Sequence, residues 1–251
     1  AVTVSSLTMI TDLTAVSNRG VSMGGFDFSN ILGYALGISF ATTILHLTHR
    51  NYEFAFVATG ILLLCAGIAT IIGVRESSRS STRRSFYVNP LVALDQSTRA
   101  ILPLWLGLTI MLGVIFVLPR SLMEFGLGYS QVGLTLALGA FALGIGSVVF
   151  GRISDKIGRG KTLGIGVVGL ILLLFSALEA VSHHPPPAYP ELLLMGLGGF
   201  MATATVPSAL AQVGDRATRG FRGSAMGIYS MMLSLGMAVG NVLGGYSTSV
   251  G

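Results

Sequence analysis

Charged side chains are scarce in this sequence, and that scarcity excludes most soluble protein classes. Only 10% of the 251 residues are Asp, Glu, Lys or Arg, against roughly 25% in a typical soluble domain. A soluble protein of this size could not cover its surface with so few charges. Glycine is abundant at 34 residues, and small residues let membrane helices approach closely. The composition therefore predicts an all-α protein, a polytopic transmembrane helical bundle.

Cysteine and histidine are also rare, which excludes disulfide frameworks and most metal sites. Cys65 is the only cysteine, so no disulfide can form within the chain. His46 and His49 lack a third ligand at a spacing that would hold a metal. A G-x-S-x-G pattern at 20–24 lacks the preceding strand that a nucleophile elbow needs. We therefore expect no metal, no cofactor and no enzymatic activity.

Long apolar runs predict the membrane spans. Helices are expected near 21–45, 54–74, 101–118, 130–150, 163–181, 192–212 and 224–246, because about 20 apolar residues cross a hydrocarbon core of roughly 30 Å. The expected partner of these helices is the lipid bilayer. In the run 192–212, Thr203, Thr205 and Pro207 interrupt the apolar pattern, and proline there favours a kink.

The basic residues gather on one side of these predicted spans. Only Arg50 and Arg120 lie on the other side. By the positive-inside rule the basic side is cytoplasmic, so the net charge of +5 reports topology and nucleic acid is not an expected partner. The 13 residues of the basic side are Arg19, Arg75, Arg79, Arg83, Arg84, Arg99, Arg152, Lys156, Arg159, Lys161, Arg216, Arg219 and Arg222.

An internal repeat connects the two ends of the chain. A shift of 203 residues lays 12–37 over 215–240 with no gap, and the identical residues include the eight pairs named below. Both copies begin on the basic side, so they are parallel repeats. The offset predicts a complete chain of roughly 400 residues, of which this sequence is a fragment. The identities pair Asp12, Arg19, Gly20, Met23, Gly24, Gly33, Ala35 and Gly37 with Asp215, Arg222, Gly223, Met226, Gly227, Gly236, Ala238 and Gly240.

A charged stretch at 151–163 is predicted to be a tight loop between two spans. Its pattern is Gly151, then Asp155-Lys156, then Gly158-Arg159 and a further cation at Lys161. This pattern resembles the loop signature of the major facilitator superfamily of secondary transporters, although Gly160 stands where that signature usually has a second basic residue. The resemblance implies a fold of two pseudo-symmetric halves, incomplete here. It makes this stretch a gating loop, with the candidate residues Gly151, Asp155, Lys156, Gly158 and Arg159.

The same resemblance suggests how the chain divides. Residues 1–74 would be the end of the first six-helix half, comprising the tail of helix four and helices five and six. Residues 75–100 would form the cytoplasmic loop between the halves, where Asn89-Pro90 could begin a short surface helix. Residues 101–251 would hold helices seven to eleven of the second half. We expect a monomeric, multi-pass protein of the plasma membrane.

Polar residues inside the spans are the candidates for substrate binding or proton coupling. Asp27 lies about eight residues past Arg19, on the order of 12 Å into the membrane. A carboxylate at that depth usually faces a cavity or a partner. Asn30 and Tyr34 share its face of the helix. Asn241 is a further candidate. A carboxylate that reaches cytoplasmic water, and a helix-to-helix hydrogen bond, are the alternatives.

Glycines at four-residue spacing predict close helix packing. Gly33 and Gly37 show this spacing in the run 21–45, and Gly236, Gly240 and Gly244 show it in the run 224–246. The second set resembles a glycine motif of proton-coupled antiporters in the superfamily. Asn241 stands where that motif has proline.

The function that these features predict is transport of a small solute by alternating access, coupled to protons if Asp27 titrates. The family resemblance implies that the signature loop of one half lies against a helix start of the other, which by pseudo-symmetry would place Asp155 at Gly20 and Val21, where it would favour the state closed to the cytoplasm. A solvated loop that only sets topology is the alternative for Asp155. For the whole chain the alternatives are a transporter-like membrane receptor or sensor, and a fragment that does not act alone.

Overall fold

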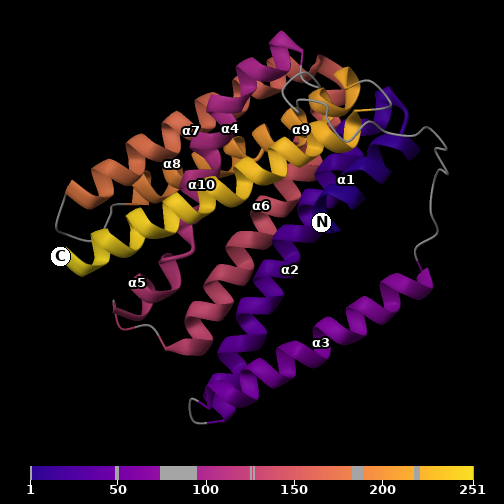
Figure 1. Ribbon diagram of the computed structural model, residues 1–251. Coiled ribbons are helices and arrows are strands. Elements are labelled where there is room, and N and C mark those ends of the chain that lie inside the picture. Colours follow the sequence, from indigo (N-terminus) through magenta and orange to yellow (C-terminus); the bar gives the residue numbers. More distant parts are fainter. Residues whose placement is uncertain are drawn as a thin grey trace.

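The computed structural model describes residues 2–48, 51–73, 95–124, 126, 128–182, 189–217 and 221–250. Within these residues the chain is helical, with turns between the helices (Figure 1). In chain order they are α1 (Val2–Leu13), the 3-10 helix η1 (Val16–Asn18), α2 (Arg19–Leu47), α3 (Tyr52–Gly73), α4 (Gln96–Ile115), α5 (Leu118–Glu124), α6 (Tyr129–Ile157), α7 (Arg159–Ser182), α8 (Tyr189–Ala202), α9 (Thr205–Arg216) and α10 (Arg222–Val250).

The predicted transmembrane bundle is confirmed in its class. Six described helical segments are long and apolar enough to cross a membrane, and the apolar part of α4, Thr98–Val114, is shorter. The predicted short helix at Asn89-Pro90 and most of the proposed 75–100 loop lie outside the described residues. In Figure 1, α3 stands apart from the other helices, and none of its residues is buried.

The internal repeat appears as two helix pairs with matching bounds. α2 and α10 each contain 29 residues and begin at Arg19 and Arg222. The preceding helices, α1 and α9, end at Leu13 and Arg216. Both helix starts and both helix ends are thus separated by the 203 residues found in the sequence. The duplication is therefore a property of the backbone as well as of the side chains.

Helices α2 and α6 lie side by side along much of their length (Figure 1). At one end they approach backbone to backbone. A Cβ added to Gly20 or to Gly151 would overlap the main chain of the other, and Gly24 meets the main chain of Ser147 in the same way. Small residues at these four positions are what allow the helix axes to come so close.

Helices α4 and α10 form the second close pair. Gly236 faces Thr109, and Gly240 faces the main chain around Ile110 and Gly113. Gly244 lies one turn further along, where a Cβ would meet the Val117 side chain at 2.8 Å. This ridge of three glycines is the packing surface that their spacing predicts.

For Gly33 and Gly37 the predicted packing is not found among the described residues. No described residue comes within 4 Å of a Cβ built at either position. They lie nine and thirteen residues beyond Gly24, roughly 180° and 220° around a helix from the side that faces α6. The four-residue spacing is present, but it lies on a face of α2 that no described helix covers at these positions.

The predicted kink in the run 192–212 is a break between α8 and α9. Thr203 and Ala204 separate the two helices, and Pro207 follows within the first turn of α9. Glycines of neighbouring helices pack closely against the break. A Cβ at Gly146 of α6 would lie 2.5 Å from Thr203 Oγ1, and one at Gly166 of α7 would lie 2.9 Å from Thr205 N. The irregular backbone is therefore buried against protein, as membrane depth requires.

The stretch 151–163 is not the loop that the sequence predicts. α6 continues through Gly151 to Ile157, and α7 begins at Arg159. Gly158 alone makes the turn, with φ +100° and ψ 151°, a conformation that is essentially restricted to glycine. The charged residues mark where the helices leave the apolar layer, and both helices carry on beyond it.

Candidate functional site

Asp155 of α6 caps the start of α2. Its Oδ1 accepts a hydrogen bond from Gly20 N–H and its Oδ2 accepts one from Val21 N–H, each at 2.8 Å. Asn18, which precedes α2, makes no side-chain capping bond of its own. A carboxylate from another helix thus satisfies two of the free N–H groups and lies at the positive end of the helix dipole. This is the contact that pseudo-symmetry predicts.

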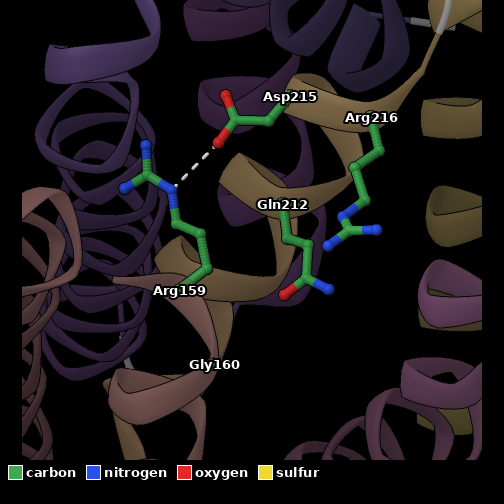
Figure 2. A pocket seen from close by; sticks show the side chains of 5 residues that line it. All are labelled: Arg159, Gly160, Gln212, Asp215 and Arg216. Carbon is green, nitrogen blue, oxygen red and sulfur yellow. Dashed lines mark hydrogen bonds and ion pairs between the residues drawn. The ribbon is translucent and has the colours of Figure 1, made fainter. Parts of the chain in front are cut away.

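Arg159, the first residue of α7, joins this carboxylate to a second one. Its guanidinium pairs with Asp155. Its Nε donates to Asp215 Oδ2 at 3.0 Å, and Figure 2 shows this second contact. It also donates to Ser154 Oγ at 3.1 Å and to the carbonyl oxygen of Val16 at 2.8 Å. One arginine therefore connects the ends of α6 and α9 with the chain that leads into α2.

Two further ion pairs are related by the repeat. Arg19 at the start of α2 pairs with Asp215 at the end of α9, and Arg222 at the start of α10 pairs with Asp12 at the end of α1 at 2.7 Å. Each pair joins one copy of the repeat to the other. Arg19 is 3% exposed and donates to two backbone carbonyl oxygens near the end of α1, each at 3.1 Å. Removal of Asp215 would leave the Arg19 guanidinium buried without its carboxylate partner.

We call Arg19, Asp155, Arg159 and Asp215 the polar cluster. A cavity of about 390 Å³ opens beside it, and Figure 2 shows the residues that line it. Both arginines of this cavity are paired, because Arg216 also contacts Asp95 at 2.9 Å. The lining residues are Arg159, Gly160, Gln212, Asp215 and Arg216.

Asp27 lies deeper, at the contact between α2 and α6. Ser147 Oγ donates a hydrogen bond to its Oδ2, so the half-buried carboxyl is bonded across the helix pair. Asn30 is exposed. Tyr34 is 52% exposed, and its ring meets Phe116 edge to face with centroids 5.8 Å apart. Of the three candidates on α2, Asp27 is the one that reaches α6.

The remaining predicted residues lie in different surroundings. Asn241 is exposed on α10, one residue past the glycine that packs on α4. Among the described residues no hydrogen bond joins it to Asp27, Asn30 or Tyr34. Lys156 is exposed, one residue after Asp155. The structure thus brings together Asp155 and Arg159 of the predicted gating loop, and it leaves the intramembrane candidates spread over two helices.

Comparison with known proteins identifies the family. The sequence model of the Major Facilitator Superfamily matches residues 105–251, which is more than half of the chain. The chain belongs to the Major Facilitator Superfamily. It is accordingly part of a multi-pass integral membrane protein, and the fold class inferred from the 151–163 stretch and the repeat is confirmed.

Curated relatives of this superfamily chain include transport and resistance proteins. The inner membrane transport protein YajR of Escherichia coli is 25% identical over 260 residues, which cover 98% of this chain and 54% of YajR. The puromycin resistance protein pur8 of Streptomyces alboniger is 29% identical over 57% of this chain and 30% of its own length. The quinolone resistance protein NorA of Staphylococcus aureus is 30% identical over 55% of this chain and 34% of its own length.

The chain thus spans about half the length of YajR and less of the other two. No solved structure matches it at a significant level.

Sequence reasoning missed two of the four residues of the polar cluster in this superfamily chain, Arg19 and Asp215. The signal was present in the repeat, where Asp12 matches Asp215 and Arg19 matches Arg222. These identities indicated a duplication, and the pairing between copies follows only when the helix ends meet. Ser147 gave no signal, because a serine in an apolar helix is common and its partner lies 120 residues away.

Proposed function

We propose that the protein moves a small solute across a membrane by alternating access. Three observations support this: membership of the Major Facilitator Superfamily, relatives named for transport and drug resistance, and two parallel repeats with matching helix bounds. Two halves that share a fold can rock against each other about a central site. We assign residues 1–74 to the first half, 75–100 to the connection and 101–251 to the second half.

The observation that carries the proposal is the set of contacts between these halves at the basic end. Asp155 binds Gly20 and Val21 across the boundary, and the reciprocal pairs Arg19–Asp215 and Arg222–Asp12 cross it as well. Parting the two halves at this end, α1 and α2 from α6, α9 and α10, would break all of them. The described conformation is therefore closed at the basic, cytoplasmic end, and these contacts hold it closed.

Asp27 is the residue that we propose for proton coupling. Its carboxyl bonds to Ser147 on the other half, so separation of α2 and α6 removes that partner. A carboxylate without a partner at membrane depth is costly, and protonation removes the charge. The protonated and deprotonated forms would then favour different conformations, which is the requirement for coupling.

A ligand screen followed by flux measurement tests the proposed function. The protein, expressed from its complete gene, is heated with sugars, organic acids, amino acids and hydrophobic drugs in turn. A substrate at 100 times its Kd adds about 2.7 kcal/mol to the stability of the folded state. A class that stabilises is then assayed for flux into proteoliposomes. If a class of compounds stabilises the protein but no member of that class is transported into the proteoliposomes, the result contradicts transport.

Proton coupling is tested with a matched pair of variants. Asp27→Asn keeps the size and the acceptor oxygen but cannot release a proton, so we expect flux to lose its dependence on a pH gradient. Ser29→Ala is the control, because Ser29 is exposed two residues away and bonds only within its own helix, to Gly25 O at 2.9 Å. A pH-gradient dependence that survives in Asp27→Asn would rule out the coupling role.

A further inference from the structure

Two cations at the end of α6 have no partner among the described residues. Arg152 and Lys156 are one helical turn apart, and both are exposed. The structure gives neither a hydrogen bond nor an ion pair, whereas Arg19, Arg159 and Arg222 nearby are all paired with carboxylates. Two like charges at this spacing repel each other. Their positive charge is therefore available to something outside the protein.

A pocket of about 250 Å³ lies beside these cations. Asp155 also lines it, but both of its carboxylate oxygens already accept N–H groups of α2, and Arg159 pairs with it. Its charge is thus compensated, and the free charge of the pocket is positive. The complete lining is Ser17, Asn18, Val21, Arg152, Asp155 and Lys156, so two hydrogen-bonding side chains and one apolar side chain accompany the cations.

The depth of the pocket matches the headgroup layer of a bilayer. The apolar part of α6 runs from Ser130 to Phe150, about 30 Å at 1.5 Å per residue, which equals the hydrocarbon thickness. Arg152 and Lys156 then lie roughly 3 Å and 9 Å beyond its edge. The headgroup layer is on the order of 5–7 Å thick on each side, so the backbone of Arg152 lies within it and that of Lys156 just beyond it. Long basic side chains at this level reach lipid phosphates while their stems stay in apolar surroundings.

We propose that this pocket binds the phosphate of an anionic phospholipid of the cytoplasmic leaflet. Arg152 and Lys156 supply the charge, and the Ser17 hydroxyl and Asn18 amide are placed to donate to phosphate oxygens. A lipid suits the site better than a soluble anion because the pocket lies at the bilayer edge, where the leaflet itself carries negative charge.

The pocket is shared between the two proposed halves of the protein, which gives the bound lipid a mechanical consequence. Ser17, Asn18 and Val21 come from η1 and α2, while Arg152 and Lys156 come from α6. A phosphate bound between them would join the same two helices that Asp155 joins. The lipid therefore stabilises the closed cytoplasmic end, because it binds the closed state more tightly than the open state. This consequence rests on the proposed gating role, whereas the binding itself does not.

The binding test uses the protein from its complete gene in detergent, titrated with phosphatidylglycerol or phosphatidylcholine and weighed intact by native mass spectrometry. We expect one phosphatidylglycerol to bind more tightly than any phosphatidylcholine. Each basic residue near an anionic surface contributes about 1 kcal/mol, so Arg152→Gln with Lys156→Gln should weaken that binding by about 30-fold. Lys161→Gln, also exposed and outside the pocket, should leave it unchanged.

A charge-conserving double variant is the control for misfolding. Arg152→Lys with Lys156→Arg should retain the tight site, and its unfolding temperature without lipid should equal that of the neutral variant. Equal binding of the two lipids, or tight binding that persists in the neutral variant, would overturn the proposal. Full displacement of the lipid by glycerol phosphate at equal concentration would instead assign a soluble anion. None of these results depends on transport, so a failure here is separate from a failure of the proposed function.

Discussion

Asp155→Asn is the substitution that most directly tests the contact between α6 and α2. The amide keeps one acceptor oxygen, so one of the two N–H groups, at Gly20 or Val21, loses its partner, and Arg159 loses a carboxylate. Loss of a helix cap costs about 0.5–2 kcal/mol. The Asp155 side chain is 9% exposed, so water replaces little of what is lost. We expect the closed state to lose about 1–2 kcal/mol, which raises the open-to-closed ratio about 5- to 30-fold.

The assay is labelling of a single cysteine by a membrane-impermeant maleimide. Cys65 is exposed on α3 and is first replaced by serine. Met23→Cys then supplies the reporter, because Met23 is 0% exposed on α2 and becomes reachable only when the helices part. When opening is fast relative to labelling, the rate follows the open population, so Asp155→Asn should label 5- to 30-fold faster. Lys161→Gln is the control. Equal rates for Asp155→Asn and the unaltered protein would refute the gating role.

Three further predictions concern stability, each measured by thermal unfolding of the purified protein. Arg19→Gln and Asp215→Asn should each cost about 1–3 kcal/mol, and the double variant should cost less than their sum, because the two residues share one ion pair; additive costs would mean that the pair contributes nothing. Gly240→Ala should destabilise by about 1–3 kcal/mol through overpacking against α4, while Gly33→Ala, which meets open space, should be neutral or stabilising; equal effects would contradict the packing. Gly158→Ala should cost about 1–3 kcal/mol because alanine is strained at φ +100°, and an unchanged melting temperature would show that the turn relaxes.

The sequence predicted the helices well because their signal is local. Apolar runs of membrane-spanning length report burial in lipid, which does not depend on distant residues. The helix ends were predicted less well, and the stretch 151–163 shows the reason. Charged residues mark the edge of the apolar layer, but a helix continues in water as long as its backbone hydrogen bonds are made, so α6 extends to Ile157 and ends only at Gly158.

The same glycine spacing predicted packing that the structure shows for α10 and that no described residue makes on α2. Gly236 and Gly240 meet α4, whereas Gly33 and Gly37 have the same spacing and meet nothing described. Spacing alone shows that one face of a helix carries a row of small residues. It does not show which neighbour, if any, lies against that row, because this depends on how all the helices are arranged.

The sequence by itself determined the membrane class of this protein and its duplication, because these depend on composition, periodicity and a repeated pattern. The meeting of Asp155 with the start of α2 was implied by the family resemblance together with the repeat, and the structure shows it. Only the tertiary structure decided that Arg19 pairs with Asp215 and Arg222 with Asp12, that Ser147 bonds to Asp27, and that Arg152 and Lys156 lie beside a pocket with no partner in the described part of the chain. Ion pairs and pockets require side chains far apart in the chain to meet, and their geometry exists only once the helices are packed.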